Sequence, residues 1–142
     1  MPDGYDSPEA AAMEGFPAKY CHVVAIRVNG DEAYVLLDTG PAGRPYLYGV
    51  NCGRRGGRWF GGASGNGPSW SLSDERTGLG TLSVWDEAPP AADRVRVEYD
   101  GQVIEEPVRE GAYLVVFWNR PSDFKHSSVA FRINGEWIDW GR

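Results

Sequence analysis

The chain has 142 residues, of which 42% are apolar and 13% aromatic, and its formal net charge is −6 with a sequence pI near 4.9. This length suits one domain or two very small ones, with enough apolar side chains for a packed interior. An acidic chain is repelled by phosphate backbones and anionic membranes, so we expect no nucleic acid and no membrane among its partners, but a protein, especially a basic one, or a neutral small ligand.

The first 16 residues are polar and acidic and lack the apolar core of a signal peptide. No segment contains the roughly 20 apolar residues that a bilayer-spanning helix needs. We therefore expect a cytoplasmic protein. In that compartment Cys21 and Cys52 stay reduced as small buried side chains, and a disulfide between them is the alternative.

A short helix is predicted after Ser7. Ser7 is a favourable N-cap, Pro8 suits the first helical position, and Glu9 favours the positive end of the helix. Gly15 is a favourable terminator.

A four-stranded meander is predicted next. Residues 21–28 and 33–38 are rich in β-branched and apolar residues, and the Asn29-Gly30-Asp31-Glu32 segment between them is typical of a hairpin. Residues 46–52 alternate in polarity, and the turn Arg55-Gly56-Gly57-Arg58 leads into a further strand. The Gly-rich segment 61–68 is expected to be a loop and the boundary between two halves.

Two Asx-Gly pairs in the second half predict tight hairpins with fixed register. For Asp100-Gly101 the predicted cross-strand pairs are Tyr99 with Gln102, Val97 with Ile104, and Arg96 with Glu105. For Asn134-Gly135 they are Val129 with Trp140, Phe131 with Ile138, and Arg132 with Trp137. We expect Phe131, Ile138 and Trp140 on the core face and a cation–π contact of Arg132 with Trp137 on the other. Residues 113–118 are apolar on both faces, as in a covered central strand.

These elements predict a mainly β fold with a minor α component, in which an antiparallel meander with one short N-terminal helix precedes a small β-sandwich-like half. Residues 79–140, with Val95-Arg96-Val97-Glu98-Tyr99-Asp100-Gly101 and Gly111-Ala112-Tyr113-Leu114-Val115-Val116, resemble bacterial immunoglobulin-like sandwiches. Residues 7–60, with Val28-Asn29-Gly30-Asp31 and Ala33-Tyr34-Val35, resemble the meander of cystatin-like or nuclear-transport-factor-like domains. Both families host many functions, so the resemblances imply a fold and no activity.

The predicted organisation is therefore a helix plus meander over residues 1–67 and an immunoglobulin-like β half over residues 68–142. The sequence leaves open whether these are separate domains or share one core. It also leaves the oligomeric state open.

The sharpest chemical motif is Asp38-Thr39-Gly40, which resembles the catalytic loop of aspartic proteases. The resemblance implies a dimer in which Asp38 shares a proton with its counterpart and Thr39 braces the loop. Pro41 replaces the small residue expected after the glycine, and no later apolar-apolar-Gly segment is present. A strand that ends in a turn is the alternative interpretation.

No other pattern indicates catalysis, a metal or a cofactor. His22 and His126 are the only histidines, and His22 adjoins Cys21 on a predicted strand, where neighbouring side chains point to opposite faces. No His, Cys or carboxylate cluster has metal-ligand spacing. We therefore expect a protein that is not an enzyme and has neither metal nor cofactor.

The candidate binding surface is the segment from Gly61 to Trp70 with the adjacent hairpin tip. Aromatic and amide groups together suit sugars or peptides, and arginines beside glycines suit an anion. Its members are Trp59, Ser64, Asn66, Trp70, Arg55 and Arg58. The alternative is that the two tryptophans cap the core and that the arginines lie on a solvated hairpin tip.

These observations favour a non-catalytic cytoplasmic binding or protein-interaction module. Three alternatives remain: an immunity-type or antitoxin-type inhibitor of a basic partner, a small-ligand pocket in the front half, and the protease-like dimer.

Overall fold

The computed structural model describes residues 4–16, 18–41, 45–65, 69–122 and 128–140. The chain divides into two compact units, Met1–Gly67 and Pro68–Arg142, called here the N-terminal and the C-terminal unit. Almost all described elements are antiparallel β-strands, and the one α-helix is short. The predicted fold class, mainly β with a minor α component, is confirmed.

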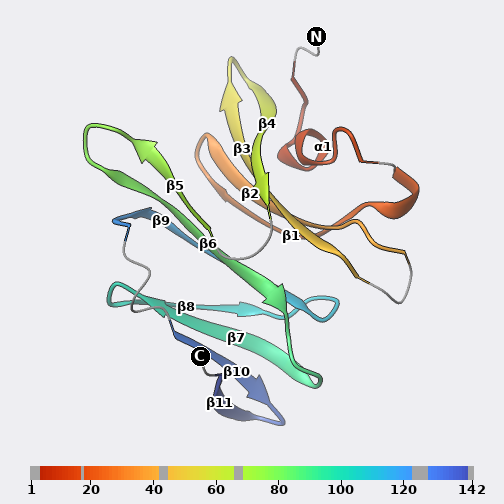
Figure 1. Ribbon diagram of the computed structural model, residues 1–142, viewed down its shortest axis with the longest axis vertical. Helices are drawn as coiled ribbons and strands as arrows, with labels where there is room; N and C mark the ends of the chain where they lie inside the picture. Colours follow the sequence, from red (N-terminus) through yellow and green to blue (C-terminus); the bar gives the residue numbers. More distant parts are fainter. Residues whose placement is uncertain (1–3, 17, 42–44, 66–68, 123–127, 141–142) are drawn as a thin grey trace. The chain divides into compact units, whose positions relative to one another are not determined.

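The N-terminal unit is a helix followed by a four-stranded meander, as predicted (Figure 1). The strands form one sheet in the order β1-β2-β3-β4. The elements are α1 (Pro8–Ala12), the 3-10 turn η1 (Ala18–Tyr20), β1 (His22–Asn29), β2 (Glu32–Asp38), β3 (Leu47–Arg55) and β4 (Arg58–Gly65).

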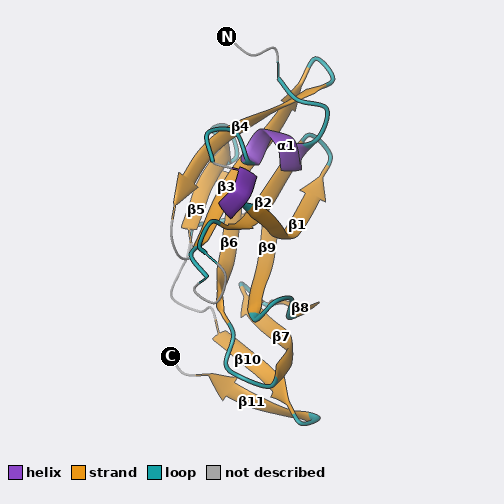
Figure 2. Ribbon diagram, turned by 90° about the vertical axis from the view of Figure 1, so that its right-hand side faces the viewer, coloured by secondary structure: helices purple, strands orange, loops and turns teal. Residues whose placement is uncertain are grey.

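Helix α1 begins where the capping residues predict. The Ser7 Oγ accepts a hydrogen bond of 3.1 Å from the Ala10 N–H, Pro8 occupies the first turn, and Gly15 adopts a positive φ of 87° after the helix. Ala11 and Ala12 are each 2% exposed and belong to the core of this unit. The helix therefore lies against the sheet through small side chains, which allow a close approach (Figure 2).

The predicted Gly-rich loop 61–68 is wrong over residues 61–65, because β4 continues to Gly65 and pairs with β3, while residues 66–68 lie outside the described residues. The glycines serve close packing in a strand. A Cβ on Gly61 would lie 3.0 Å from the carbonyl oxygen of Ala11, and one on Gly62 would lie 2.8 Å from that of Asn51. Composition alone does not distinguish such glycines from loop glycines.

The C-terminal unit consists of two antiparallel sheets with the orders β5-β6-β9 and β11-β10-β7-β8. Side chains from β6, β7, β9 and β10 share one apolar core, so the two sheets pack face to face. The strands are β5 (Ser69–Asp74), β6 (Leu79–Glu87), β7 (Ala92–Tyr99), β8 (Gln102–Pro107), β9 (Ala112–Arg120), β10 (Ser128–Ile133) and β11 (Glu136–Trp140).

Both predicted Asx-Gly hairpins are confirmed with their register. Asp100 and Gly101 have φ values of 53° and 76°, and Asn134 and Gly135 have values of 53° and 83°, so both central residues of each turn are left-handed. All six predicted cross-strand pairs occur. The turns thus fix which face of β7, β8, β10 and β11 each side chain takes.

Alternate residues of the apolar run of β9, Tyr113, Val115 and Phe117, belong to the core of the C-terminal unit. Residues 113–117 are all buried, so both faces of β9 are covered as predicted, but the expected central position is wrong, because β9 lies at the edge of the sheet β5-β6-β9. The ring centroids of Tyr99 and Phe117 lie 5.7 Å apart, and those of Tyr113 and Phe131 lie 5.3 Å apart. Aromatic side chains therefore supply much of the volume of this small core.

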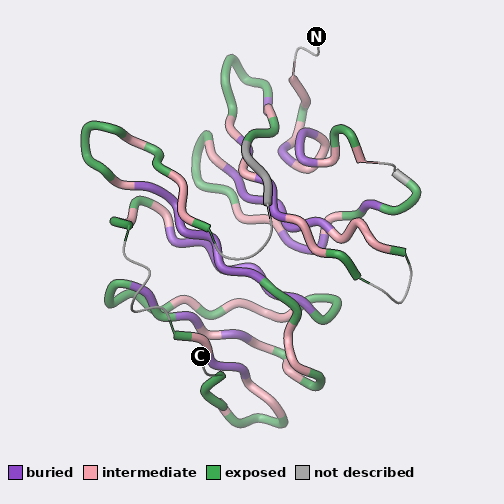
Figure 3. Tube along the Cα trace, viewed as in Figure 1, coloured by how far each residue is buried: buried purple, intermediate pink, exposed green. Residues whose placement is uncertain are grey.

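Strand β11 differs from the prediction in two respects. Trp140 and Ile138, expected in the core, are 51% and 42% exposed, and Figure 3 marks most of β11 as exposed. The expected contact of Arg132 with Trp137 is also wrong, because Arg96 lies over that indole instead. Arg132 makes two charge-assisted hydrogen bonds to Asp93, which are stronger than an exposed cation–π contact.

Candidate interaction site

Trp59, predicted as a binding residue, is part of the core of the N-terminal unit. Its side chain is 6% exposed. Its backbone N–H and C=O form a pair of 2.8 Å hydrogen bonds with Tyr5, and Arg54 lies over the indole at 5.3 Å. In this position the ring presents little surface to a ligand.

Trp70, the second predicted aromatic, lies on β5 in the C-terminal unit and is half-buried. Its Nε1 donates a 3.1 Å hydrogen bond to the carbonyl oxygen of Arg120. The structure places the two tryptophans in different units. Ser64 pairs through its backbone with Val50, while its side chain and all of Asn66 lie outside the described residues.

The arginines of the β3–β4 hairpin contact groups of their own unit. Arg58 forms an ion pair of 2.6 Å with Asp6, and Arg55 lies over the ring of Phe60 at 4.9 Å. The turn joins two strands, whereas a phosphate loop leads from a strand into a helix. The geometry therefore agrees with the alternative interpretation, in which these arginines lie on a solvated hairpin tip and do not form an anion site.

Asp38 acts as a turn acceptor at the end of β2. Its Oδ1 accepts hydrogen bonds from the N–H groups of Gly40 at 2.9 Å and Tyr46 at 3.0 Å. The Thr39 Oγ1 donates to the carbonyl oxygen of Tyr46 at 3.1 Å. These contacts close a turn at the end of the strand. The geometry agrees with the alternative interpretation of Asp38-Thr39-Gly40, in which the motif ends a strand and has no catalytic role.

Both cysteines are free and buried, as predicted. Burial, followed by the charge of Glu9, raises the pKa of the Cys52 thiol to about 11. Burial and then the charge of Asp38 raise the pKa of Cys21. A protonated, buried thiol is a poor nucleophile at neutral pH. Among the described residues no group of three or more His, Cys, Asp or Glu has the geometry of a metal site.

A hollow in the N-terminal unit lies between α1 and the β3–β4 strands, with a volume of about 140 Å³. Its lining includes Ala12, Glu14, Val50 and Gly61. Ligand pockets are usually about 300–1,000 Å³, so this hollow suits only a very small molecule. It offers little support for a pocket protein.

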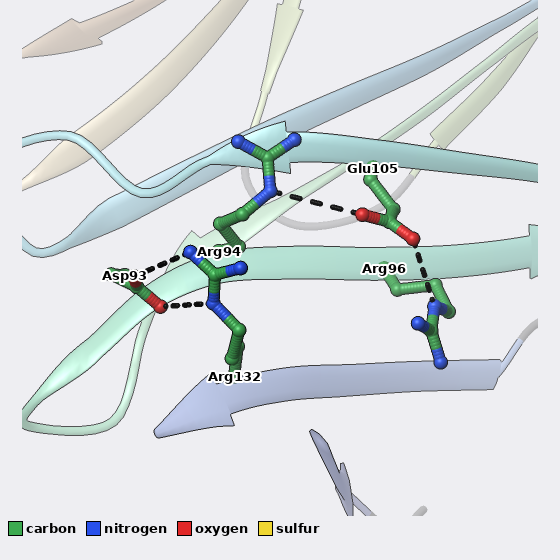
Figure 4. A network of polar contacts seen from close by, with 5 residues as sticks. All are labelled: Asp93, Arg94, Arg96, Glu105 and Arg132. Carbon is green, nitrogen blue, oxygen red and sulfur yellow. Dashed lines mark hydrogen bonds and ion pairs between the residues drawn. The ribbon is translucent and has the colours of Figure 1, made fainter. Parts of the chain in front are cut away.

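Charged residues form a network on the outer face of the sheet β11-β10-β7-β8 in the C-terminal unit (Figure 4). Glu105 on β8 lies between Arg96 at 3.2 Å and Arg94 at 3.7 Å, both on β7. Arg132 on β10 reaches Asp93 with two bonds of 3.0 and 2.7 Å, which lower the pKa of that carboxyl. These ion pairs join β7 to β8 and to β10, and they hold the charged side chains in place on the sheet face that also carries Trp137.

Among the described residues of the C-terminal unit, the most exposed aromatic side chain, Trp140, lies on strand β11. Trp140 is held on one side by an edge-to-face contact of 5.6 Å with Phe131, yet half of its side chain is accessible. Ile138 is on the same side of the strand and is 42% exposed. We call Glu136–Trp140, with these two side chains, the β11 edge.

The β11 edge is also an open edge with a regular backbone. In the described residues, the ladders that hold the edge strands β1, β4, β5 and β9 all contain a register shift, and β8 ends in Pro107. The β10–β11 ladder runs without a shift over five pairs, and β11 contains no proline. Bulges and prolines are two of the features that protect edges from pairing with another chain; β11 has neither, and its protection is limited to its short length and its two acidic residues.

Comparisons of this chain with protein families, with curated sequences and with solved structures find no match. No helix in the described part of the chain is long and apolar enough to cross a bilayer.

The sequence did not predict the β11 edge, because its pattern placed Ile138 and Trp140 on the core face. The register that supported this placement is correct. Register fixes the face of a residue but does not show whether an opposing strand covers it. The short length of the strand and its two acidic residues are typical of an edge and were the available indication.

Proposed function

We propose that this protein is a non-catalytic protein-interaction module and that it contacts its partner through the β11 edge. The observation that carries this proposal is the exposure of Trp140 and Ile138 on the core side of an open, regular strand. Apolar side chains in this position gain buried area when a partner covers them. Aromatic residues are moreover enriched at the centres of protein interfaces.

The strand order of the C-terminal unit supports an immunoglobulin-like assignment as part of this proposal. Lettered A to G in chain order, its strands form the sheets A-B-E and G-F-C-D. The constant-type immunoglobulin arrangement is A-B-E-D and G-F-C, so only the fourth strand changes sheet. The assignment concerns architecture, and the interaction role rests on the β11 edge.

We also propose a cytoplasmic location. The two buried, free thiols Cys21 and Cys52 support it, since chains in oxidising compartments more often pair their cysteines.

A second candidate within the same class is an inhibitor that binds a basic protein. The net charge of −6 favours it, because the field of an acidic protein attracts a basic partner and speeds the encounter. An inhibitor predicts that the captured partner has an activity which the purified protein suppresses at equimolar concentration. A module without inhibitory function leaves that activity unchanged.

The test of the proposed function is a native pull-down from cells of the source organism, analysed by mass spectrometry. The tagged wild-type chain is compared with Trp140→Ala and with Val103→Ala. Val103 is the matched control, because it is 52% exposed on β8, the other edge strand of the same sheet. We expect at least a tenfold loss of the partner with Trp140→Ala and retention with Val103→Ala. Equal capture by both variants would contradict the proposal, provided that circular dichroism shows both folded.

A further inference from the structure

We infer that the β11 edge binds an extended segment of a partner protein in which apolar and basic residues alternate. This segment joins the sheet β11-β10-β7-β8 as a fifth strand beside β11. The inference rests on the proposed function and names the chemistry of the partner at the same site. It follows from the backbone, the core side and the outer side of β11, taken in turn.

The backbone of β11 offers hydrogen-bonding groups to a new strand. In an antiparallel hairpin with a two-residue turn, the residues that flank the turn form a hydrogen-bonded pair, and the next pair does not. The pair Ile133–Glu136 flanks the turn, so Ile138 and Trp140 direct their N–H and C=O groups toward β10. Trp137 and Asp139 consequently direct theirs toward the open edge.

The core side of the edge requires apolar residues in the partner. Ile138 and Trp140 lie on this side, and their side chains are 42% and 51% exposed. A strand added beside β11 would place every second side chain next to them. Apolar side chains at these positions would extend the contact of Trp140 with Phe131 and remove the exposed area from water.

The outer side of the edge favours basic residues at the intervening positions. Asp139 and Trp137 lie on this side, and both a carboxylate and an indole attract a cation. Trp137 already holds the guanidinium of Arg96 at 3.9 Å from the ring centroid, so Asp139 is the group on this side that has no basic partner among the ion pairs of the described residues.

The charge of the whole C-terminal unit agrees with this preference. Residues 68–142 contain 13 acidic and 8 basic side chains, which gives a net charge of −5. A second copy of the chain would bring the same charge and the same Asp139 to the edge. Because like charges repel across an interface, a basic segment of another protein is the occupant that the edge favours.

The test uses three synthetic peptides of eight residues with blocked ends. The first alternates lysine with valine or isoleucine, the second replaces every lysine by glutamate, and the third contains the residues of the first with the four lysines in one block. We expect the first peptide to bind at least tenfold more tightly than either other peptide, as measured by titration calorimetry. Its affinity should fall as NaCl is raised from 50 to 500 mM.

Two variants separate the backbone contribution from the charge. Asp139→Asn removes the carboxylate and should weaken the first peptide severalfold. Asp139→Pro also removes an N–H that faces the open edge, while the N–H groups that face β10 remain, so it should abolish binding. Hydrogen exchange measured by NMR should show slower exchange of the Trp137 and Asp139 amides when the first peptide is bound. Unchanged exchange of both amides would overturn strand addition.

The remaining outcomes distinguish this inference from the proposed function. Equal binding of the lysine and glutamate peptides, or binding of none while the cellular partner still depends on Trp140, would overturn the inferred chemistry and leave the interaction role intact. The wild-type protein could also dimerise in the absence of a partner, with slow hydrogen exchange at the Trp137 and Asp139 amides. That result would show that a second copy occupies the edge and would overturn the inference. A cellular partner that is indifferent to Trp140 would contradict the proposed function itself.

Discussion

The guanidinium of Arg96 lies 3.9 Å from the ring centroid of Trp137, although β10 separates the strands of these two residues. The register shows how this contact crosses a strand. Ala130 on β10 lies opposite Arg96, and its small side chain leaves room for the arginine to extend toward β11. The contact thus connects β7 to the edge strand and holds Trp137 against the outer face of the sheet.

Removal of this contact should measurably loosen the edge. We expect Arg96→Ala and Trp137→Ala to show a coupling free energy of about 0.5–1 kcal/mol in a double-mutant cycle, as for an exposed cation–π pair. Urea unfolding of the four proteins gives the value. Arg94→Ala paired with Trp137→Ala is the control and should give no coupling. A zero coupling for Arg96 would show that the stacking contributes nothing to stability.

The burial of Trp59 predicts a structural role for this residue. Trp59→Ala should lower the free energy of unfolding of the N-terminal unit by about 3–5 kcal/mol, because the large side chain is 6% exposed and its removal leaves a cavity. Chemical denaturation monitored by circular dichroism measures the loss. A folded Trp59→Ala protein of wild-type stability that had lost a binding partner would instead restore Trp59 as a binding residue.

Gly80 on β6 is required by close packing. A Cβ at this position would collide with the carbonyl oxygen of Ser71 and lie 2.6 Å from the Trp70 ring, and the backbone oxygen has little freedom to move. We expect Gly80→Ala to destabilise the C-terminal unit by about 1–3 kcal/mol. The matched control is Gly53→Ala on β3, where the nearest atom is 4.0 Å away and thermal unfolding should barely change.

Tyr113 predicts a specific sensitivity to alkali. Burial, followed by the charge of Asp86, raises the pKa of its phenol from 10.0 to about 12. Between these two values the unfolded chain loses the phenolic proton while the folded chain keeps it. The unfolded state is therefore favoured as the pH rises from 10 to 12, and this loss of stability is absent below pH 10.

The variant Tyr113→Phe cannot ionise at this position. Its free energy of unfolding should therefore fall less than that of the wild type between pH 10 and 12, by about 2 kcal/mol at most. Guanidinium titrations at pH 9, 10, 11 and 12 compare the two proteins. Parallel pH profiles would show that Tyr113 ionises equally well in the folded state.

Much of the fold follows from local sequence, because the determinants are local. Ser7 and Pro8 define a helix start through hydrogen bonds and a backbone angle set within a few residues. Asp100-Gly101 and Asn134-Gly135 define register in the same way, since a two-residue turn with both φ values positive permits one pairing. Each of these predictions is confirmed to the residue.

The candidate site was less predictable, because exposure depends on residues that are distant in sequence. Trp59 and Trp70 flank one Gly-rich segment in the chain, but the structure places them in different units, where the first is buried and the second donates a hydrogen bond to Arg120. Gly61 and Gly62 suggest a flexible loop by composition. Only the positions of Ala11 and Asn51 show that they allow close packing within a strand.

The sequence by itself determined the two Asx-Gly hairpins and the face on which each of their side chains lies, because turn chemistry and a period of two residues act over short distances. The tertiary structure alone decided which strands lie at the edges and which faces are covered, because those properties depend on where distant strands pack. Trp140 illustrates the difference: its register partner, Val129, followed from Asn134-Gly135, whereas its half-exposed indole at an open edge followed only from the arrangement of the sheets.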